Sequence, residues 1–223
     1  MTDLPPIRAV LWDFDGTLAD STELILRSYR HTMTTHLGAS PPDADWLSGF
    51  GTTLEAQIRR FARSDAEMGA MLATYRAFQD RHHDALLRPF PGVLETVEEL
   101  ARRGIAQAIV TSKHRNGTLR GMELCGLLDH VGVIVTPEDV RNPKPHPEPV
   151  RHALARLGVA EEETLFVGDS PHDVAAGKAA GVRTAGALWG PFPPEALERA
   201  APDLLLRDHT EVRDLVAGAA TVG

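Results

Sequence analysis

The sequence predicts an α/β fold: a Rossmann-like, doubly wound parallel sheet with an all-helical domain inserted into it. Outside residues 20–86, short apolar runs typical of buried strands alternate with segments of helical periodicity. Such alternation favours a parallel sheet with helices on both faces. Residues 20–86 interrupt it, because their apolar side chains recur only at helical spacing.

The core elements follow one another at regular intervals. The first strand is predicted over residues 7–12, an apolar run that ends at Asp13. Later apolar runs predict strands over 106–110, 131–135, 164–167, 182–186 and 203–206. The intervening periodicity predicts helices near 92–103, 114–125, 147–157, 171–180 and 209–217.

The inserted segment has two clear apolar stripes at helical spacing, one from Leu24 to Leu37 and one from Met68 to Phe78. Asp20 or Ser21 is suited to cap the first helix. We therefore expect a helical cap domain over 19–87 and a core domain formed by 1–18 and 88–223, with hinges near 18–20 and 87–91.

Composition limits the possible functions. The chain has 223 residues and a net charge of −8, and its arginines are scattered, which argues against a nucleic-acid partner. Cys125 is the only cysteine, so no disulfide can form within the chain. No apolar run approaches the ~20 residues that span a bilayer, and no leader pattern opens the sequence. We expect a cytoplasmic protein with no membrane partner.

The first chemical signal lies where the first strand ends. Asp13 and Asp15 stand two residues apart, and Gly16 allows a sharp turn. Two neighbouring carboxylates repel each other unless a cation or a proton offsets their charge. A carboxylate beside a hard cation such as Mg²⁺ can also act as a nucleophile, with its neighbour as acid/base.

Three later segments bring further polar groups to strand ends or stiff loops. Thr111 and Ser112 follow a strand, Lys144 lies in a proline-rich segment, and Asp169 follows another strand. In open parallel sheets, ligands bind beyond the carboxyl ends of the strands. A hydroxyl, an ammonium and carboxylates that converge on Asp13 predict a site for phosphate and Mg²⁺.

With these motifs in this order, the chain resembles the haloacid dehalogenase superfamily of aspartate-dependent phosphohydrolases over nearly its full length. The motifs are Asp-Phe-Asp-Gly-Thr from residue 13, Thr111-Ser112, Lys144 before a proline, and Gly-Asp-Ser-Pro-His-Asp from residue 168. The segments 88–93, 144–149 and 168–181 are closest to phosphoglycolate phosphatase-like members. The resemblance implies a helical cap of the kind predicted above.

The resemblance also implies roles for individual residues. Asp13 corresponds to the nucleophile that forms an aspartyl-phosphate, and Asp15 to the acid/base. Thr111 and Lys144 correspond to the phosphate-binding catalytic pair, with Gly16 and Ser112 beside them. The implied Mg²⁺ ligands are Asp13, Asp169 and the backbone carbonyl of Asp15. Asp173 corresponds to the second acid of the last motif, which supports Lys144 or a metal-bound water, and Ser170 stands beside it as a further supporting residue.

Neighbouring activities of the same family fit less well. Dehalogenases lack an acid at the position of Asp15, phosphonate-cleaving members need a cap lysine, and residues 20–86 contain none. Sugar-phosphate mutases carry a cap histidine where Ile25 stands. We therefore expect a Mg²⁺-dependent phosphatase for a small phosphorylated metabolite, with phosphoglycolate as the leading substrate. Pyrophosphate, a broad range of sugar phosphates, and a non-catalytic phosphometabolite-sensing module stay open, as does the choice between monomer and homodimer.

Overall fold

The computed structural model describes residues 5–217 and contains a six-stranded sheet in the order β5-β4-β1-β6-β7-β8. Every neighbouring pair in it is parallel. The strands are β1 Ala9–Trp12, β4 Ala106–Val110, β5 Val133–Val135, β6 Thr164–Gly168, β7 Arg183–Ala187 and β8 Leu204–Leu206. The predicted doubly wound α/β fold is thereby confirmed.

The central strand β1 lies between β4 and β6 and ends next to the candidate site. Its four residues are all buried, as expected for a strand covered on both faces. Trp12 pairs with Ile109 of β4 on one side and with Val167 of β6 on the other. From β1 the chain moves outward to β4 and β5, and then returns to β6 on the opposite side. The residues after β1, β4 and β6 therefore meet at the switch point of the sheet.

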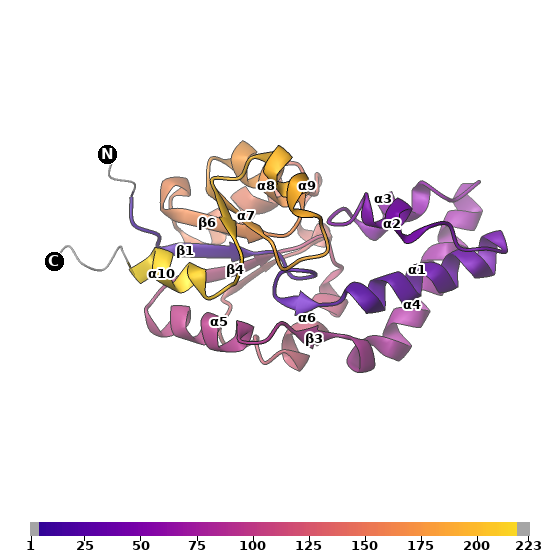
Figure 1. Ribbon diagram of the computed structural model, residues 1–223, viewed down its shortest axis with the longest axis horizontal. Helices are drawn as coiled ribbons and strands as arrows, with labels where there is room; N and C mark the ends of the chain where they lie inside the picture. The colour runs from indigo at the N-terminus through magenta and orange to yellow at the C-terminus, as the bar shows by residue number, and fades with distance from the viewer. Residues whose placement is uncertain (1–4, 218–223) are drawn as a thin grey trace.

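Helices cover both faces of this sheet (Figure 1). Val10 and Trp12 belong to one apolar cluster, whereas Leu11 belongs to a second cluster on the other face, because successive side chains of a strand point to opposite faces. The helices are α5 Val93–Arg102, α6 Arg115–Leu124, α7 Glu148–Leu157, α8 Pro171–Ala180, α9 Pro194–Ala200 and α10 Glu211–Ala217, with short 3₁₀ turns at Pro137–Asp139 and Glu161–Glu163.

The observed ends differ from the predicted ones by one or two residues, except for α9, which the sequence analysis does not predict. That helix begins at Pro194, after two further prolines at 191 and 193. Prolines usually interrupt helices, but proline is well tolerated in the first turn, where its missing N–H would have no partner.

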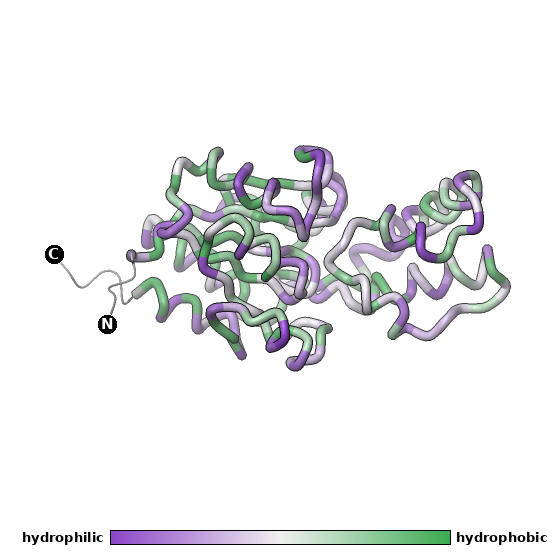
Figure 2. Tube along the Cα trace, turned by 90° about the horizontal axis from the view of Figure 1, so that it is seen from above, coloured by the Kyte–Doolittle hydropathy of each residue, from purple (hydrophilic) through white to green (hydrophobic). Residues whose placement is uncertain are grey.

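Residues 22–86 form a separate helical body beside the sheet (Figure 1), and the view from above shows it as a second lobe (Figure 2). It contains α1 Thr22–Leu37, α2 Asp43–Leu47, α3 Leu54–Arg59 and α4 Asp65–Leu86. Tyr29, Met33, Trp46, Met71 and Tyr75 belong to an apolar cluster of its own. The two predicted stripes therefore pack mainly against each other, through α1 and α4.

The helical body is joined to the sheet body by a short antiparallel ribbon that the sequence analysis did not predict. In this ribbon, β2 Ala19–Asp20 pairs with β3 Arg88–Pro89. The N–H of Phe90 also donates to the carbonyl of Leu18 at 3.2 Å. Both crossings of the chain lie in the segments predicted as hinges. None of the helices over residues 5–217 is both long enough and apolar enough to cross a membrane.

Candidate active site

The loop after β1 holds Asp13 in a fixed position. Its N–H donates to the carbonyl of Val167 at 2.9 Å, and the N–H of Phe14 donates to Asp13 Oδ1 at 2.7 Å. Gly16 turns the loop at φ +83°, and a Cβ there would lie 2.5 Å from Asp169 Oδ2. Only glycine fits, because a side chain would both strain the backbone and meet a buried carboxylate.

Lys144 joins two of the predicted carboxylates. Its Nζ lies 3.0 Å from Asp13 Oδ1 and 2.6 Å from Asp173 Oδ1, and it donates to the carbonyl of Val110 at 3.1 Å. The lysine residue is only 3% exposed. Burial alone would lower the pKa of Lys144, but the two carboxylates outweigh it and raise the pKa above its ordinary value. Lys144 is therefore a permanent buried cation.

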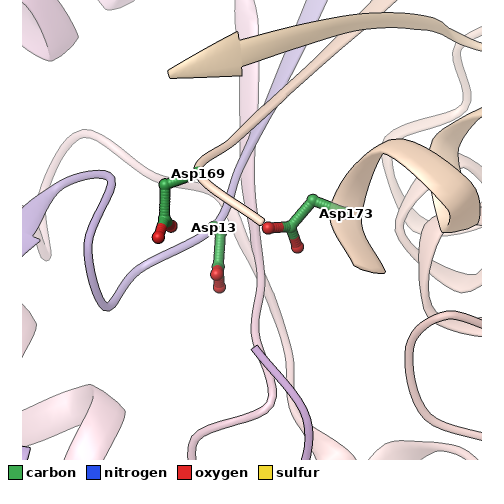
Figure 3. A group of neighbouring side chains, drawn as sticks. All are labelled: Asp13, Asp169 and Asp173. Carbon is green, nitrogen blue, oxygen red and sulfur yellow. The ribbon is translucent and has the colours of Figure 1, made fainter. Parts of the chain in front are cut away.

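Asp13 lies between Asp173 and Asp169 (Figure 3). Thr17 Oγ1 donates to Asp169 Oδ1 at 2.9 Å, and the loop that carries Thr17 is tied down in turn by Trp189 Nε1, which donates to the Thr17 carbonyl at 2.9 Å. Asp169 Oδ2 is buried and has no hydrogen-bond partner within the described part of the chain. An orphaned buried carboxylate oxygen is costly unless a cation satisfies it.

The charges at this place do not balance without a further cation. Asp13, Asp169 and Asp173 are buried and offer oxygens within 4.8 Å of one another, and Lys144 supplies one compensating charge. Burial, opposed by Lys144 and reinforced by Asp173, raises the pKa of Asp13 to about 7. Burial and the Asp13 and Asp173 carboxylates raise the pKa of Asp169 well above its usual range. The residues therefore fit a hard divalent cation with oxygen ligands.

Asp173 and Ser170 stabilise the arrangement rather than face the pocket. Ser170 caps α8: its Oγ and its N–H both donate to Asp173 Oδ2, at 2.6 and 3.0 Å, and the Asp173 N–H returns a bond to Ser170 Oγ. This is a reciprocal capping box at a helix N-terminus. Asp173 therefore points one oxygen at Lys144 and anchors the other on its own helix.

Asp15 lies on the open side of Asp13 and forms an ion pair that the sequence analysis did not predict. Lys113 Nζ donates to both oxygens of Asp15, at 2.9 and 3.0 Å. The lysine side chain is 5% exposed and that of Asp15 is 17% exposed. A signal for it was present, because Lys113 directly follows Thr111 and Ser112 past the end of β4, where the sheet topology collects polar groups.

The predicted polar groups after β4 also reach this place. Thr111 Oγ1 accepts a hydrogen bond from the N–H of Lys113 at 3.2 Å, and Thr111 lines the pocket with Asp13 and Asp15. The hydroxyl of Ser112 instead donates to the carbonyl of Gly51 at 2.7 Å. Gly51 belongs to the loop between α2 and α3, so Ser112 connects the sheet edge to the helical body.

The pocket itself has a volume of about 340 Å³ and lies between the two bodies. The sheet body contributes Asp13, Asp15, Thr111, Lys113 and His114, and the helical body contributes, among others, Trp46, Phe50, Glu55, Tyr75 and Arg76. Lys144 and Asp169 lie behind Asp13, out of reach of bulk water. The volume suits a small molecule.

Two histidines, His83 and His114, have partners within the protein. His83 of α4 is 4% exposed and its Nδ1 lies 2.9 Å from Asp84 Oδ1, whereas the preceding His82 is only partly buried. Adjacent residues of a helix point about 100° apart, so one of the pair turned inward. His114 lines the pocket and also caps α6, where its Nδ1 accepts from the N–H of Gly117.

Comparison with known proteins agrees with this geometry. The sequence matches the family of haloacid dehalogenase-like hydrolases over residues 10–187. The chain therefore belongs to the haloacid dehalogenase-like hydrolase family. The predicted enzyme class, a phosphatase of this family, is confirmed by that membership together with the names of its relatives.

One similar relative is a protein named pyrophosphatase PpaX from Halalkalibacterium halodurans, 39% identical over 210 residues that cover 94% of this chain and 97% of the relative. A structure described as a putative haloacid dehalogenase-like hydrolase from Bacteroides fragilis superposes with a TM-score of 0.85 at 27% identity, covering 92% of this chain and 99% of that one. A structure described as a putative phosphoglycolate phosphatase from Lactobacillus plantarum has a TM-score of 0.84 at 26% identity, covering 94% and 99%.

Proposed function

We propose that the protein is a Mg²⁺-dependent hydrolase of a small phosphorylated metabolite and that it acts through an aspartyl-phosphate on Asp13. One observation carries the proposal: the Asp13 carboxylate, with Lys144 3.0 Å away, lines a pocket that also contains Asp15. A nucleophile and a second carboxylate that line one small pocket, with a permanent cation against the nucleophile, are the groups that two-step phosphoryl transfer requires.

In the first step, a carboxylate oxygen of Asp13 attacks phosphorus, the bond from phosphorus to the leaving oxygen breaks, and Asp15 gives its proton to that oxygen. In the second step, Asp15 takes a proton from water, the water oxygen attacks phosphorus, and the bond to Asp13 breaks. Inorganic phosphate leaves and Asp13 is restored. Thr111, Lys144 and the backbone at Gly16 and Ser112 are proposed to bind the phosphoryl oxygens, since the Ser112 hydroxyl is already engaged by the Gly51 carbonyl.

The metal ligands are proposed to be Asp13, Asp169 and the backbone carbonyl of Asp15. The orphaned Asp169 Oδ2 supports this set. Bound Mg²⁺ would offset the repulsion between an anionic nucleophile and an anionic substrate. Asp173 is proposed as a positioning residue because both of its oxygens are already engaged, by Lys144 and by Ser170.

The helical body over 19–87 is proposed to act as a cap over a core formed by 1–18 and 88–223. Part of the pocket lining comes from this body, and the Ser112–Gly51 hydrogen bond connects the two. A lid that excludes water protects the acyl-phosphate and strengthens charge interactions inside the site.

Two substrates deserve the first tests. Phosphoglycolate is the leading expectation from the sequence, and the name of a structural neighbour supports it. Pyrophosphate has equal support, from the name of a relative that matches over almost its full length. Both are small, and both carry a second anionic group.

The test is phosphate release from a panel of small phosphate esters and pyrophosphate, with Mg²⁺ and with excess chelator. We expect turnover only with the metal. Absence of turnover on every compound, together with tight metabolite binding, would instead favour the sensing module. Size-exclusion chromatography with light scattering would decide between monomer and homodimer.

A further inference from the structure

Lys113 is a buried cation that the proposed reaction has not used. Its side chain is 5% exposed, its Nζ contacts both oxygens of Asp15, and it lies 5.8 Å from the centre of the Phe14 ring. Burying an ammonium costs several kcal/mol unless it is well paired. A neutral hydrogen-bond donor could position Asp15 without the cost of burying a charge. The positive charge of Lys113 therefore indicates a second role, in addition to positioning Asp15.

The position of Lys113 indicates which part of a substrate it faces. In the proposed reaction Asp15 contacts the leaving oxygen, and Lys113 Nζ is 2.9 Å from Asp15. Lys144, by contrast, contacts Asp13 and Asp173 and is not among the residues that line the pocket, whereas Lys113 is. In the proposed reaction Lys144 therefore acts at the nucleophile and the transferring phosphoryl group, and Lys113 lies beside Asp15 on the leaving-group side.

A second cation lines the same pocket from the helical body. Arg76 of α4 is paired with Glu55 of α3, and both residues line the pocket with Lys113. Their side chains are 45% and 47% exposed, so their mutual attraction is weak. Arg76 is thus free to exchange Glu55 for a better anion at small cost.

We propose that Lys113, with Arg76, binds a negatively charged group on the departing part of the substrate and thereby selects substrates with a second anionic group. Lys113 keeps Asp15 in place in the free enzyme with two of its three N–H donors and offers the third to the leaving group once substrate is bound. This inference rests on the proposed function and deepens it. It groups pyrophosphate and phosphoglycolate in one substrate class, and it predicts poor activity on esters of neutral alcohols.

The test compares two esters of nearly equal shape. Phosphoglycolate and 2-hydroxyethyl phosphate differ in one group, a carboxylate in the first and a hydroxymethyl group in the second. The wild-type enzyme should have the higher kcat/KM for phosphoglycolate. Lys113→Met should lower kcat/KM for phosphoglycolate and for pyrophosphate at least about tenfold more than for 2-hydroxyethyl phosphate.

Two further variants complete the test. Lys113→Arg keeps the charge and should keep most of the preference for phosphoglycolate. Arg76→Gln should lower the preference about threefold to tenfold, less than Lys113→Met because Arg76 is more exposed. It also serves as an independent test if Lys113→Met does not fold. Lys178→Met is the matched control, since Lys178 lies on α8 and donates to the carbonyl of Ala200, and it should change nothing.

The outcomes distinguish a failure of this inference from a failure of the proposed function. If the wild-type enzyme releases phosphate but Lys113→Met loses the same factor on both esters, Lys113 only positions Asp15 and this inference is overturned alone. The same holds if the wild-type enzyme prefers 2-hydroxyethyl phosphate. If the wild-type enzyme in Mg²⁺ releases phosphate from other small phosphate esters but from none of these compounds, this inference alone is overturned, and if it releases phosphate from no ester of the whole panel, the proposed function fails as well.

Discussion

The floor and the mouth of the pocket hold similar ion pairs in very different surroundings. The floor comprises Asp13, which lines the pocket, together with the buried groups behind it, Lys144, Asp169 and Asp173, and each of the four is at most 3% exposed. The mouth contains Lys113 with Asp15 and, further out, Arg76 with Glu55, where side-chain exposure rises from 5% to 47%. Charge interactions are strong in the dry floor and are screened by water near the rim.

This gradient separates two tasks. The floor fixes Asp13, Lys144 and Asp173 through several contacts each, so it can stabilise a developing charge without rearranging. The outer part of the mouth is held by one solvated pair, so it can adapt to different leaving groups. Substitutions in the floor should therefore change the rate for every substrate, whereas substitutions in the mouth should change the choice among substrates.

The largest effect is expected for Asp13→Asn. The change keeps the shape of the side chain and removes the attacking charge. Because a covalent-catalysis group is lost, the rate should fall at least ~10³-fold. Single-turnover assays with every active substrate measure this. Retention of more than a tenth of wild-type turnover on any of them would show that the floor does not supply the nucleophile.

Asp169→Ala is expected to remove most activity by weakening the metal site. Thr17 loses its partner, but the orphaned oxygen is removed as well, so the fold should survive. The apparent Mg²⁺ requirement should rise at least about tenfold, as measured by titrating Mg²⁺ in activity assays and by calorimetry. Asp214→Ala, at an exposed position of α10, is the matched control. An unchanged Mg²⁺ titration would exclude Asp169 as a ligand.

Asp173→Asn tests the support behind Lys144. The amide keeps contacts to Ser170 but no longer supplies a charge to the buried ammonium. We expect kcat to fall about 10- to 100-fold on all substrates alike, since this residue acts through Lys144. Steady-state assays on phosphoglycolate and pyrophosphate measure the loss. A loss restricted to one substrate would mean that Asp173 affects the leaving group directly and that the floor and mouth are not separate.

The crowded carboxylates of the floor should also make the metal-free fold sensitive to pH. The pKa of Asp13 is about 7 in the folded protein and has its ordinary value of 3.8 in the unfolded chain. Between about pH 4 and pH 7, Asp13 is therefore more protonated in the folded protein than in the unfolded chain. Stability in chelator should therefore decrease as pH rises through this window. Thermal unfolding should show a lower Tm at pH 8 than at pH 5, and Asp13→Asn should reduce the difference. Equal Tm values at pH 5 and pH 8 for the metal-free wild type would contradict a raised pKa of Asp13.

The smallest effect is expected for Ser112→Ala, which removes the hydrogen bond to the Gly51 carbonyl. A single such bond contributes about 0.5–1.5 kcal/mol, so KM should rise about two- to twelvefold with little change in kcat. Competitive inhibition by inorganic phosphate provides the control, because phosphate binding in the floor should not change. A loss in kcat larger than the change in KM would place Ser112 in the chemical step instead of in closure.

The strands of the core could be predicted from the sequence because most of them are short apolar runs. Asp13, Thr111 and Asp169 directly follow three of these runs, so the parallel topology alone predicts that the three side chains meet. The helical insert was readable from its two apolar stripes. The α9 helix was not, because its opening prolines resemble a loop and only their place in the first turn makes them compatible with a helix.

The pairing of charges could not be predicted in the same way. Lys113 pairs with Asp15 within the sheet body, and Arg76 pairs with Glu55 within the helical body. Each pair joins segments that are far apart in sequence, so it depends on how the elements of that body pack. The burial of His83 has the same origin, since it depends on the rotation of α4 and not on local composition.

The ribbon that joins the two bodies has a consequence for how such a protein can change over evolution. Asp20 and Arg88 lie opposite each other in β2 and β3, so the whole helical body leaves and re-enters the sheet body at one point, like the loop of a hairpin. Because its two ends are adjacent, the inserted helical body can be exchanged, lengthened or shortened at little additional entropic cost of loop closure for the sheet body. We infer that substrate range can diverge by replacing one insert while the strand register, and with it the spacing of the aspartates, stays untouched.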